Sequence, residues 1–187
     1  AAVPADSVDS TDSAAEVSTA CAAEGNYIMT GPWRCEVVPL PGHRLSLRID
    51  GVERTQWLFD PFDPKPCFFP LRGPSGQELT RMGHPGAPNH DHHRSVWFAH
   101  HRLLGIDFWG IQSTARIWQR DWLVYEDGEN RAAFAVTLNW ADGHDPHPLI
   151  EQELIVQLLP LAAGEYLLDL QSTFRPQAAS VEFQQTN

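Results

Sequence analysis

Histidine is the residue type whose distribution in this chain points most directly to chemistry. Six of the nine histidines lie close together, at positions His84, His90, His92, His93, His100 and His101. Imidazole titrates near neutral pH and is a common ligand of transition metals, so a dense group of histidines suits proton transfer or metal binding. The spacing therefore predicts that several of these rings share one ligand.

Residues 89–100 form the centre of this segment, and we expect them to be extended. Side chains alternate between the two faces of a strand, so His90, His92 and His100 would share one face with Arg94. A His-x-His pair on a strand suits zinc, iron, copper or manganese. On this interpretation His90 and His92 are two metal ligands, and His100 or a distant carboxylate is the third.

A metal-free site is an alternative for the same residues. In that case His92 and His93 serve as general acid and base, and Arg94 holds an anionic or polyhydroxyl group. A third interpretation assigns no chemistry to the segment, because histidines in a proline-rich region can simply bind backbone carbonyls. The pattern alone leaves all three interpretations open.

Acidic and aromatic residues near the histidines could complete such a site. Asp107 could orient a histidine, or it could cap a turn. Trp97 and Trp109 could be core residues or platforms on which a sugar ring stacks. Further along, Glu151 and Glu153 share one strand face, where they are either a carboxylate pair for glycoside chemistry or a solvated surface.

The sequence pattern predicts that the elements which position these residues are β-strands. Apolar and polar residues alternate, or apolar runs are flanked by turn residues, at 44–50, 55–59, 67–69, 95–100, 115–125, 133–140, 150–159, 166–174 and 181–183. Seven of the fifteen prolines fall within 60–88, which excludes a helix or a central strand there. Residues 127–130 read as a hairpin turn. The pattern predicts an all-β fold, an antiparallel β-sandwich.

Length and charge narrow the class of protein. A chain of 187 residues is long enough for one domain with a core, and we expect a sandwich over 26–187 after a disordered acidic tail at 1–25. The net charge is 13 − 24 = −11, and Lys65 is the single lysine, which argues against nucleic-acid binding and against a polybasic membrane anchor. No apolar stretch is long enough for a transmembrane segment.

The cysteines and the first residues bear on the compartment. Cys21 and Cys35 could form a disulfide, or these two and Cys67 could all be free thiols. The sequence begins with two alanines, which suits a mature form released by a signal peptidase. We therefore expect a periplasmic or secreted protein, with a cytoplasmic one as the alternative.

Residues 60–110 resemble the PmoA-like "methane oxygenase" family, a bacterial group common near carbohydrate-degradation genes. Four ordered runs carry the resemblance, at 68–76, 79–81, 90–100 and 105–109. Matching positions are occupied by His90, His92, His93, Arg94, Trp97, His100, Asp107 and Trp109. Asn89 and Asp91 stand where the family motif has Asp and Pro, so the role of that first acid does not carry over.

The resemblance also implies properties of the whole chain. Family members are longer, so this chain looks like a truncated member whose sandwich is incomplete at its C-terminus and belongs to a larger supersandwich. An open sheet edge of that kind would favour self-association. The family label further implies a metal-dependent oxygenase.

The leading hypothesis is an exported β-sandwich enzyme that acts on a carbohydrate, or on another polyhydroxylated small molecule, by hydrolysis, elimination or epimerisation. The predicted catalytic residues are His92, His93, Arg94 and Asp107, and the predicted substrate-binding residues are Arg72, Trp97 and Trp109. A non-catalytic carbohydrate-binding module is one alternative. The other is an oxygenase that uses a divalent zinc, iron, copper or manganese ion held by His90, His92 and His100.

Overall fold

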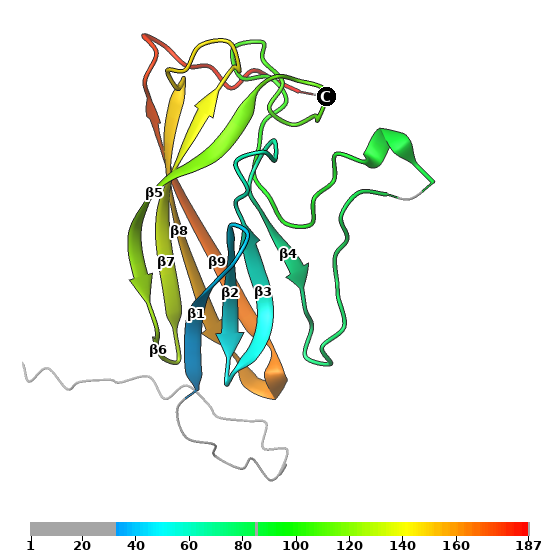
Figure 1. The fold of residues 1–187 in the computed structure, drawn as a ribbon, viewed down its shortest axis with the longest axis vertical. Helices are drawn as coiled ribbons and strands as arrows, with labels where there is room; N and C mark the ends of the chain where they lie inside the picture. Colours follow the sequence, from blue (N-terminus) through cyan, green and yellow to red (C-terminus); the bar gives the residue numbers. More distant parts are fainter. Residues whose placement is uncertain (1–32, 85, 187) are drawn as a thin grey trace, which may run out of the picture. The chain divides into compact units, whose positions relative to one another are not determined.

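Nine strands build the part of the chain that the computed structural model describes, residues 33–84 and 86–186 (Figure 1). In chain order they are β1 (Arg34–Leu40), β2 (Arg44–Ile49), β3 (Val52–Leu58), β4 (Cys67–Leu71), β5 (Arg116–Glu126), β6 (Gly128–Glu129), β7 (Ala132–Ala141), β8 (Ile150–Pro160) and β9 (Tyr166–Pro176). Two short 3₁₀ turns, η1 (Pro88–His90) and η2 (Ala162–Gly164), are the helical segments of this part of the chain. Neither turn could cross a membrane.

The strands form two antiparallel sheets. One has the order β4-β3-β2-β1-β6 and the other the order β5-β7-β8-β9. The short strand β6 follows β5 in the chain, but it pairs with β1 and is therefore an edge strand of the five-stranded sheet, whereas β5 belongs to the four-stranded sheet. Alternation of apolar and polar residues along β2 and β8 explains why each sheet has one buried face.

The core lies between the two sheets. Aromatic rings from both sheets meet there, since Phe134 of β7 lies 5.9 Å from the ring of Trp57 on β3 and 6.4 Å from that of Phe68 on β4. All ten residues of β7 are buried. The prediction of an all-β, antiparallel sandwich is thus confirmed.

Most of the predicted strands are present, and the differences have local causes. The strand β1 was not predicted, because alternation is weak along its sequence. The predicted strand at 95–100 is absent except for a single bridge between Val96 and Phe68. The strand expected at 181–183 is likewise reduced to a bridge between Phe183 and Leu103. These stretches lack a full-length partner strand, so their extended residues do not join a ladder.

The predicted hairpin turn at 127–130 is more elaborate than a simple reversal. The carboxylate of Asp127 accepts a hydrogen bond from the backbone N–H of Val37, at 2.7 Å, and the side chain of Asn130 accepts one from the N–H of Trp33. These polar side chains tie the turn to β1 and place β6 at the edge of the other sheet.

The long connection between β4 and β5 carries almost all of the predicted site residues. Figure 1 shows this connection, in green, leaving the sheets and returning beside the C-terminal segment. The bridge between Leu103 and Phe183, and a hydrogen bond from the N–H of Gln184 to the carbonyl of Arg102, hold the two segments together. The site is therefore built on loops whose ends are fixed by the sandwich.

Cys35 and Cys67 are buried free thiols. Cys21 and the predicted acidic tail at 1–25 lie outside the described residues.

Candidate functional site

The histidine segment is folded as a turn, not as a strand. Residues 88–90 form the 3₁₀ turn η1, and the N–H of His93 donates to the carbonyl of His90 at 3.0 Å. The expected alternation of faces from His90 to His100 is therefore wrong. Pro88 accounts for this, because proline favours the first turn of a helical segment and cannot donate to a strand ladder.

The turn gathers four imidazole rings. The ring centroids of His92 and His93 are 4.5 Å apart, those of His90 and His93 are stacked at 5.0 Å, and those of His84 and His90 are 5.7 Å apart. The prediction that these histidines converge thus holds for His90, His92 and His93, with His84 as a fourth member. We call these four residues the imidazole cluster.

The geometry does not fit the predicted set of metal ligands. His100 is outside the cluster, because its Nε2 lies 2.9 Å from the carbonyl oxygen of Gln184 and its ring packs against Phe183. Within residues 33–84 and 86–186, no group of three or more His, Cys, Asp or Glu side chains is placed to hold a metal ion. The proposed trio of His90, His92 and His100 therefore does not form one site.

Two tryptophans form an aromatic platform next to the imidazole cluster. The ring centroids of Trp97 and Trp109 are 4.1 Å apart, and Trp109 is 38% exposed. The ring of His92 lies 6.0 Å from that of Trp109. Trp109 is therefore not a core residue, and its indole is available to a ligand. We call this pair the tryptophan platform.

The single lysine contacts both residues of this platform. Lys65 is 1% exposed, and its ammonium group lies 4.4 Å from the centre of the Trp97 ring. The same ammonium donates to the carbonyl oxygen of Trp109 and, at 3.3 Å, to that of Gly110. Burial lowers the pKa of Lys65 to about 8, against a partly opposing effect from the nearby Asp107.

A pocket of about 300 Å³ opens on one side of the platform. Its lining residues are Thr80, Arg81, His93, Ser95, Trp97 and Trp109. The hydroxyl groups of Thr80 and Ser95 lie 2.6 Å apart, and Ser95 has a φ of 60°, a conformation that costs energy for a residue other than glycine. The pocket combines aromatic surface with hydroxyl, guanidinium and imidazole groups.

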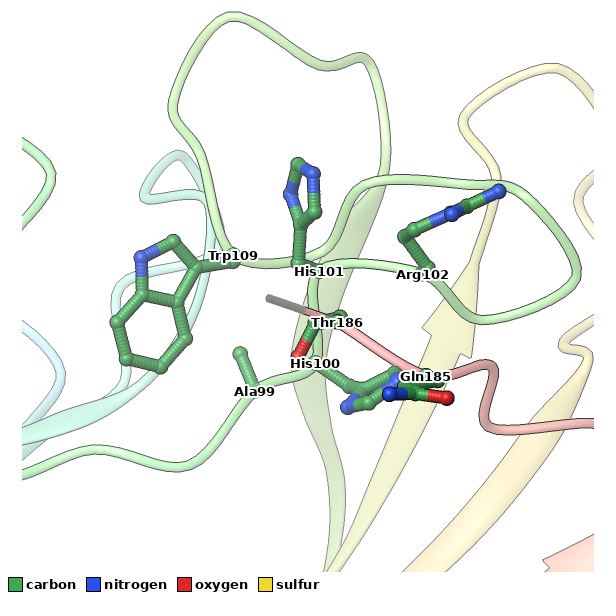
Figure 2. Close-up of a pocket in the computed structure, with 7 residues that line it drawn as sticks. All are labelled: Ala99, His100, His101, Arg102, Trp109, Gln185 and Thr186. Atoms are coloured by element: carbon green, nitrogen blue, oxygen red, sulfur yellow. The ribbon is translucent and has the colours of Figure 1, made fainter.

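A second pocket, of about 650 Å³, is also lined by Trp109. Figure 2 shows its lining residues, which are Ala99, His100, His101, Arg102, Trp109, Gln185 and Thr186. In this view His101 stands between Trp109 and Arg102. Because Trp109 lines both pockets, a ligand that covers its indole can reach groups on either side.

Asp107 serves a histidine and a turn at once. Its carboxylate accepts hydrogen bonds from the N–H groups of Trp109, at 2.7 Å, and Gly110, at 2.9 Å, and lies 3.1 Å from Nδ1 of His101. Both alternatives expected for Asp107 are therefore present. The histidine that it orients is His101 and not a member of the imidazole cluster.

Two further ionisable groups at the site, besides Lys65, have shifted pKa values. Burial of the ring, reinforced by the neighbouring His92, His90 and Arg81, lowers the pKa of His93. Burial alone would raise the pKa of Asp107, but the hydrogen bonds that its carboxylate accepts lower it below its usual value. His93 is therefore neutral, and Asp107 ionised, at neutral pH.

The two predicted arginines lie away from both pockets. Nη2 of Arg94 donates to Oδ2 of Asp63 at 2.7 Å, and the Arg94 side chain is only 16% exposed. Arg72 lies 3.2 Å from Glu78 and also donates to the carbonyl of Gly76. Both arginines thus have structural partners, which their positions in the sequence do not reveal.

Glu151 and Glu153 do not form a catalytic pair. Glu151 is bonded to Arg120 at 2.7 Å, and Glu153 to Arg175 at 2.9 Å, on the partly exposed face of β8. They belong to the surface of the sandwich, as their alternative interpretation predicts.

Four features of the site that involve ionisable groups were not predicted: Lys65, Arg81, Arg102 and the pairing of His101 with Asp107. Lys65 carries a sequence signal, because it is the single lysine and sits among prolines. The other three carry none, since loops bring them to Trp109.

Comparison with known proteins gives one match. Residues 44–187 match a family described as a family of unknown function, DUF6807. No curated protein and no solved structure is significantly similar to the chain.

Proposed function

The chain belongs to the DUF6807 family, and we propose that it binds a carbohydrate, or another polyhydroxylated small molecule, at the tryptophan platform and transforms it chemically. The observation that carries this proposal is the position of Trp109, whose exposed indole is a wall of two pockets. The C–H face of a sugar ring packs on such an indole, while its hydroxyl groups need hydrogen-bond partners around the rim.

The rim of the platform supplies those partners. His93, Ser95 and Thr80 offer imidazole and hydroxyl groups on one side, and His101 offers an imidazole on the other. Hydroxyl and imidazole groups both donate and accept hydrogen bonds, which matches the chemistry of a sugar hydroxyl.

Two histidines support a role for the site in proton transfer. His93 is neutral at neutral pH because its pKa is lowered, so it can accept a proton. His101 is oriented by the carboxylate of Asp107, which lies 3.1 Å from its Nδ1. We assign the acid and base roles to His93 and His101, in place of the predicted set of His92, His93, Arg94 and Asp107. Asp107 becomes the residue that positions His101.

Turnover by single variants tests this assignment. With a panel of oligosaccharides as substrates, His101→Gln should reduce turnover at least about 100-fold, since removal of a general acid or base costs that order. The affinity for the substrate should change much less. The matched control is His147→Gln, because His147 also pairs with an aspartate, at 2.8 Å, but on an exposed loop. Equal turnover of both variants and the unmodified chain would exclude this role for His101.

A non-catalytic carbohydrate-binding module is the second candidate. One observation favours it: none of the residues described as lining the two pockets is an aspartate or a glutamate. This candidate predicts that Trp109→Ala abolishes binding, while substitutions of His93 and His101 hardly change it and no sugar is turned over.

The oxygenase that the PmoA-like resemblance implies stays a prediction, and the match to DUF6807 does not describe an activity. Metal analysis of the purified protein tests it, because near-stoichiometric iron or copper would support it and an active metal-free sample would rule it out.

A further inference from the structure

We infer that the saccharide is an anionic one that carries carboxylate groups, a uronate, and that the protein cleaves it by β-elimination. This inference rests on the proposed function, because it names the substrate and reaction of the same site. It draws on the charge around the tryptophan platform and on the kinds of acid and base present there.

The segment that forms the site has the opposite charge to the rest of the chain. The whole chain has a net charge of −11. Between Glu78 and Asp107, however, the sequence contains three arginines and six histidines but a single acidic residue, Asp91. A basic region attracts an anionic ligand. Because the rest of the protein is acidic, such a ligand is attracted to this region and not to the remaining surface.

Two of the three arginines in this segment are free to bind such a ligand. Arg94 is already paired with Asp63. Arg81 donates through Nε to the carbonyl of Gly83, at 3.0 Å, and makes no ion pair with any described residue. The guanidinium group of Arg102 contacts no acidic side chain in the described part of the chain. Guanidinium groups bind carboxylates through paired, charge-assisted hydrogen bonds.

These arginines line two different pockets that share the same tryptophan. Arg81 lines the smaller pocket and Arg102 the larger, and Trp109 lines both. In Figure 2 the imidazole of His101 stands between Trp109 and Arg102. On this proposal the uronate ring packs on Trp109, its carboxylate meets Arg102, and His101 acts on the carbon next to that carboxylate.

The available acids and bases favour elimination over hydrolysis. Most glycoside hydrolases use two carboxyl groups that flank the scissile bond. Here Asp107 is the single carboxylate that contacts a lining residue of either pocket through a described bond, and its oxygen is already bonded to His101 and to two backbone N–H groups. Imidazole bases are present on both sides of the platform instead.

The elimination step balances without a further reactant. Arg102 neutralises the carboxylate and so makes the C5–H bond of the uronate more acidic. His101 takes that proton, the electron pair of the C–H bond forms the C4=C5 double bond, and the C4–O glycosidic bond breaks. The leaving oxygen takes a proton from water, and the hydroxide that remains takes the proton from His101, so that both return to their starting states. The products are one chain with a new reducing end and one with an unsaturated uronate.

The experiment compares uronate oligosaccharides with neutral oligosaccharides of the same length, using the full chain. Binding is measured by calorimetry, new chain ends by a reducing-sugar assay, and elimination by the ultraviolet absorbance of the unsaturated product. We expect the uronates to bind more tightly than their neutral partners and to yield reducing ends and absorbance in equal amounts. Arg102→Gln should weaken uronate binding at least about tenfold, as expected for the loss of one charge-assisted contact, and leave neutral sugars unaffected.

Arg131→Gln is the matched control, because Arg131 is an exposed arginine that pairs with Glu126 in the hairpin after β5. The conservative Arg102→Lys should restore part of the lost affinity. Reducing ends without absorbance would mean hydrolysis and would overturn the reaction. Neutral sugars bound as tightly as uronates would overturn the substrate class but leave the proposed function standing. If no saccharide of either kind binds, the proposed function fails as well.

Discussion

Lys65 is the residue on which the geometry of the tryptophan platform depends most. Its ammonium joins the Trp97 ring to the backbone at Trp109 and Gly110 while being almost fully buried. Burying a charge is unfavourable unless it is well partnered, and a cation–π contact and two carbonyls are the partners here. The platform is thus held in place at some cost to stability.

The pH dependence of unfolding tests this account of Lys65. Its pKa is about 8 in the folded chain and 10.5 when unperturbed. Between these values the folded chain binds fewer protons than the unfolded chain, so the free energy of unfolding should rise with pH. Lys65→Met removes this titrating group. Measured by chemical denaturation, the free energy of unfolding of the unmodified chain minus that of Lys65→Met should rise by about 2 kcal/mol from pH 8 to pH 10. A difference that stays flat or falls across this range would show that the ammonium is not buried.

For single residues, the type of chemistry that a side chain can perform is easier to predict from the sequence than the side chain that it will contact. The convergence of His90, His92 and His93 follows from their spacing. The partner of Arg94 does not, because Asp63 lies 31 positions earlier and only the fold brings the two together. The pairing of Asp107 with His101 could not be predicted for the same reason. Only the geometry of the turn shows that Asp107 contacts this histidine, six positions away, and not one of those in the denser run.

Among the elements, most strands were predictable, with β1 as an exception, and the loops were not. Alternation along β2, and the apolar face of β7 with Phe134, Val136, Leu138 and Trp140, mark these strands in the sequence. The histidine segment also looked extended, but Pro88 and a hydrogen bond from His93 to His90 turn it into a 3₁₀ segment. Loop conformation depends on such single contacts, which periodicity does not detect.

The loop before β8 supplies a sharp test at this scale. Gly143 has a φ of +86°, and a Cβ atom there would lie 2.2 Å from the carbonyl oxygen of Thr114, in the segment just before β5. Gly143→Ala should therefore destabilise the fold by about 3 kcal/mol or more, because a backbone oxygen cannot move aside as a side chain can. Thermal or chemical unfolding measures this loss.

Gly51→Ala is the control for that substitution. Gly51 has a similar φ of +76°, but no atom lies within 4 Å of the added Cβ. Its cost should be limited to about 1 kcal/mol, the backbone preference alone. Equal losses in the two variants would mean that Thr114 and Gly143 are not in close contact.

At the scale of the whole molecule, the fold class follows from the sequence but the role of β9 required the structure. β9 is an outer strand of its sheet, eleven residues long, and it exposes Leu167 by 50% and Leu170 by 40%. Long outer strands with exposed apolar residues tend to pair with another chain. The expected self-association should therefore occur through β9.

Sedimentation velocity tests that expectation. The average sedimentation coefficient should rise with protein concentration for the unmodified chain, and Leu167→Lys should reduce the rise because a charge would be buried in the contact. A single monomeric species at every concentration would contradict self-association.

Titration calorimetry with Trp109→Ala measures the binding of a saccharide to the tryptophan platform. The control is Trp122→Ala, since Trp122 is similarly exposed, at 44%, but lies on β5. We predict that the unmodified chain and the control bind at least one oligosaccharide of the panel with equal affinity, and that Trp109→Ala weakens binding about 30-fold or more. Undiminished binding by Trp109→Ala would contradict the account.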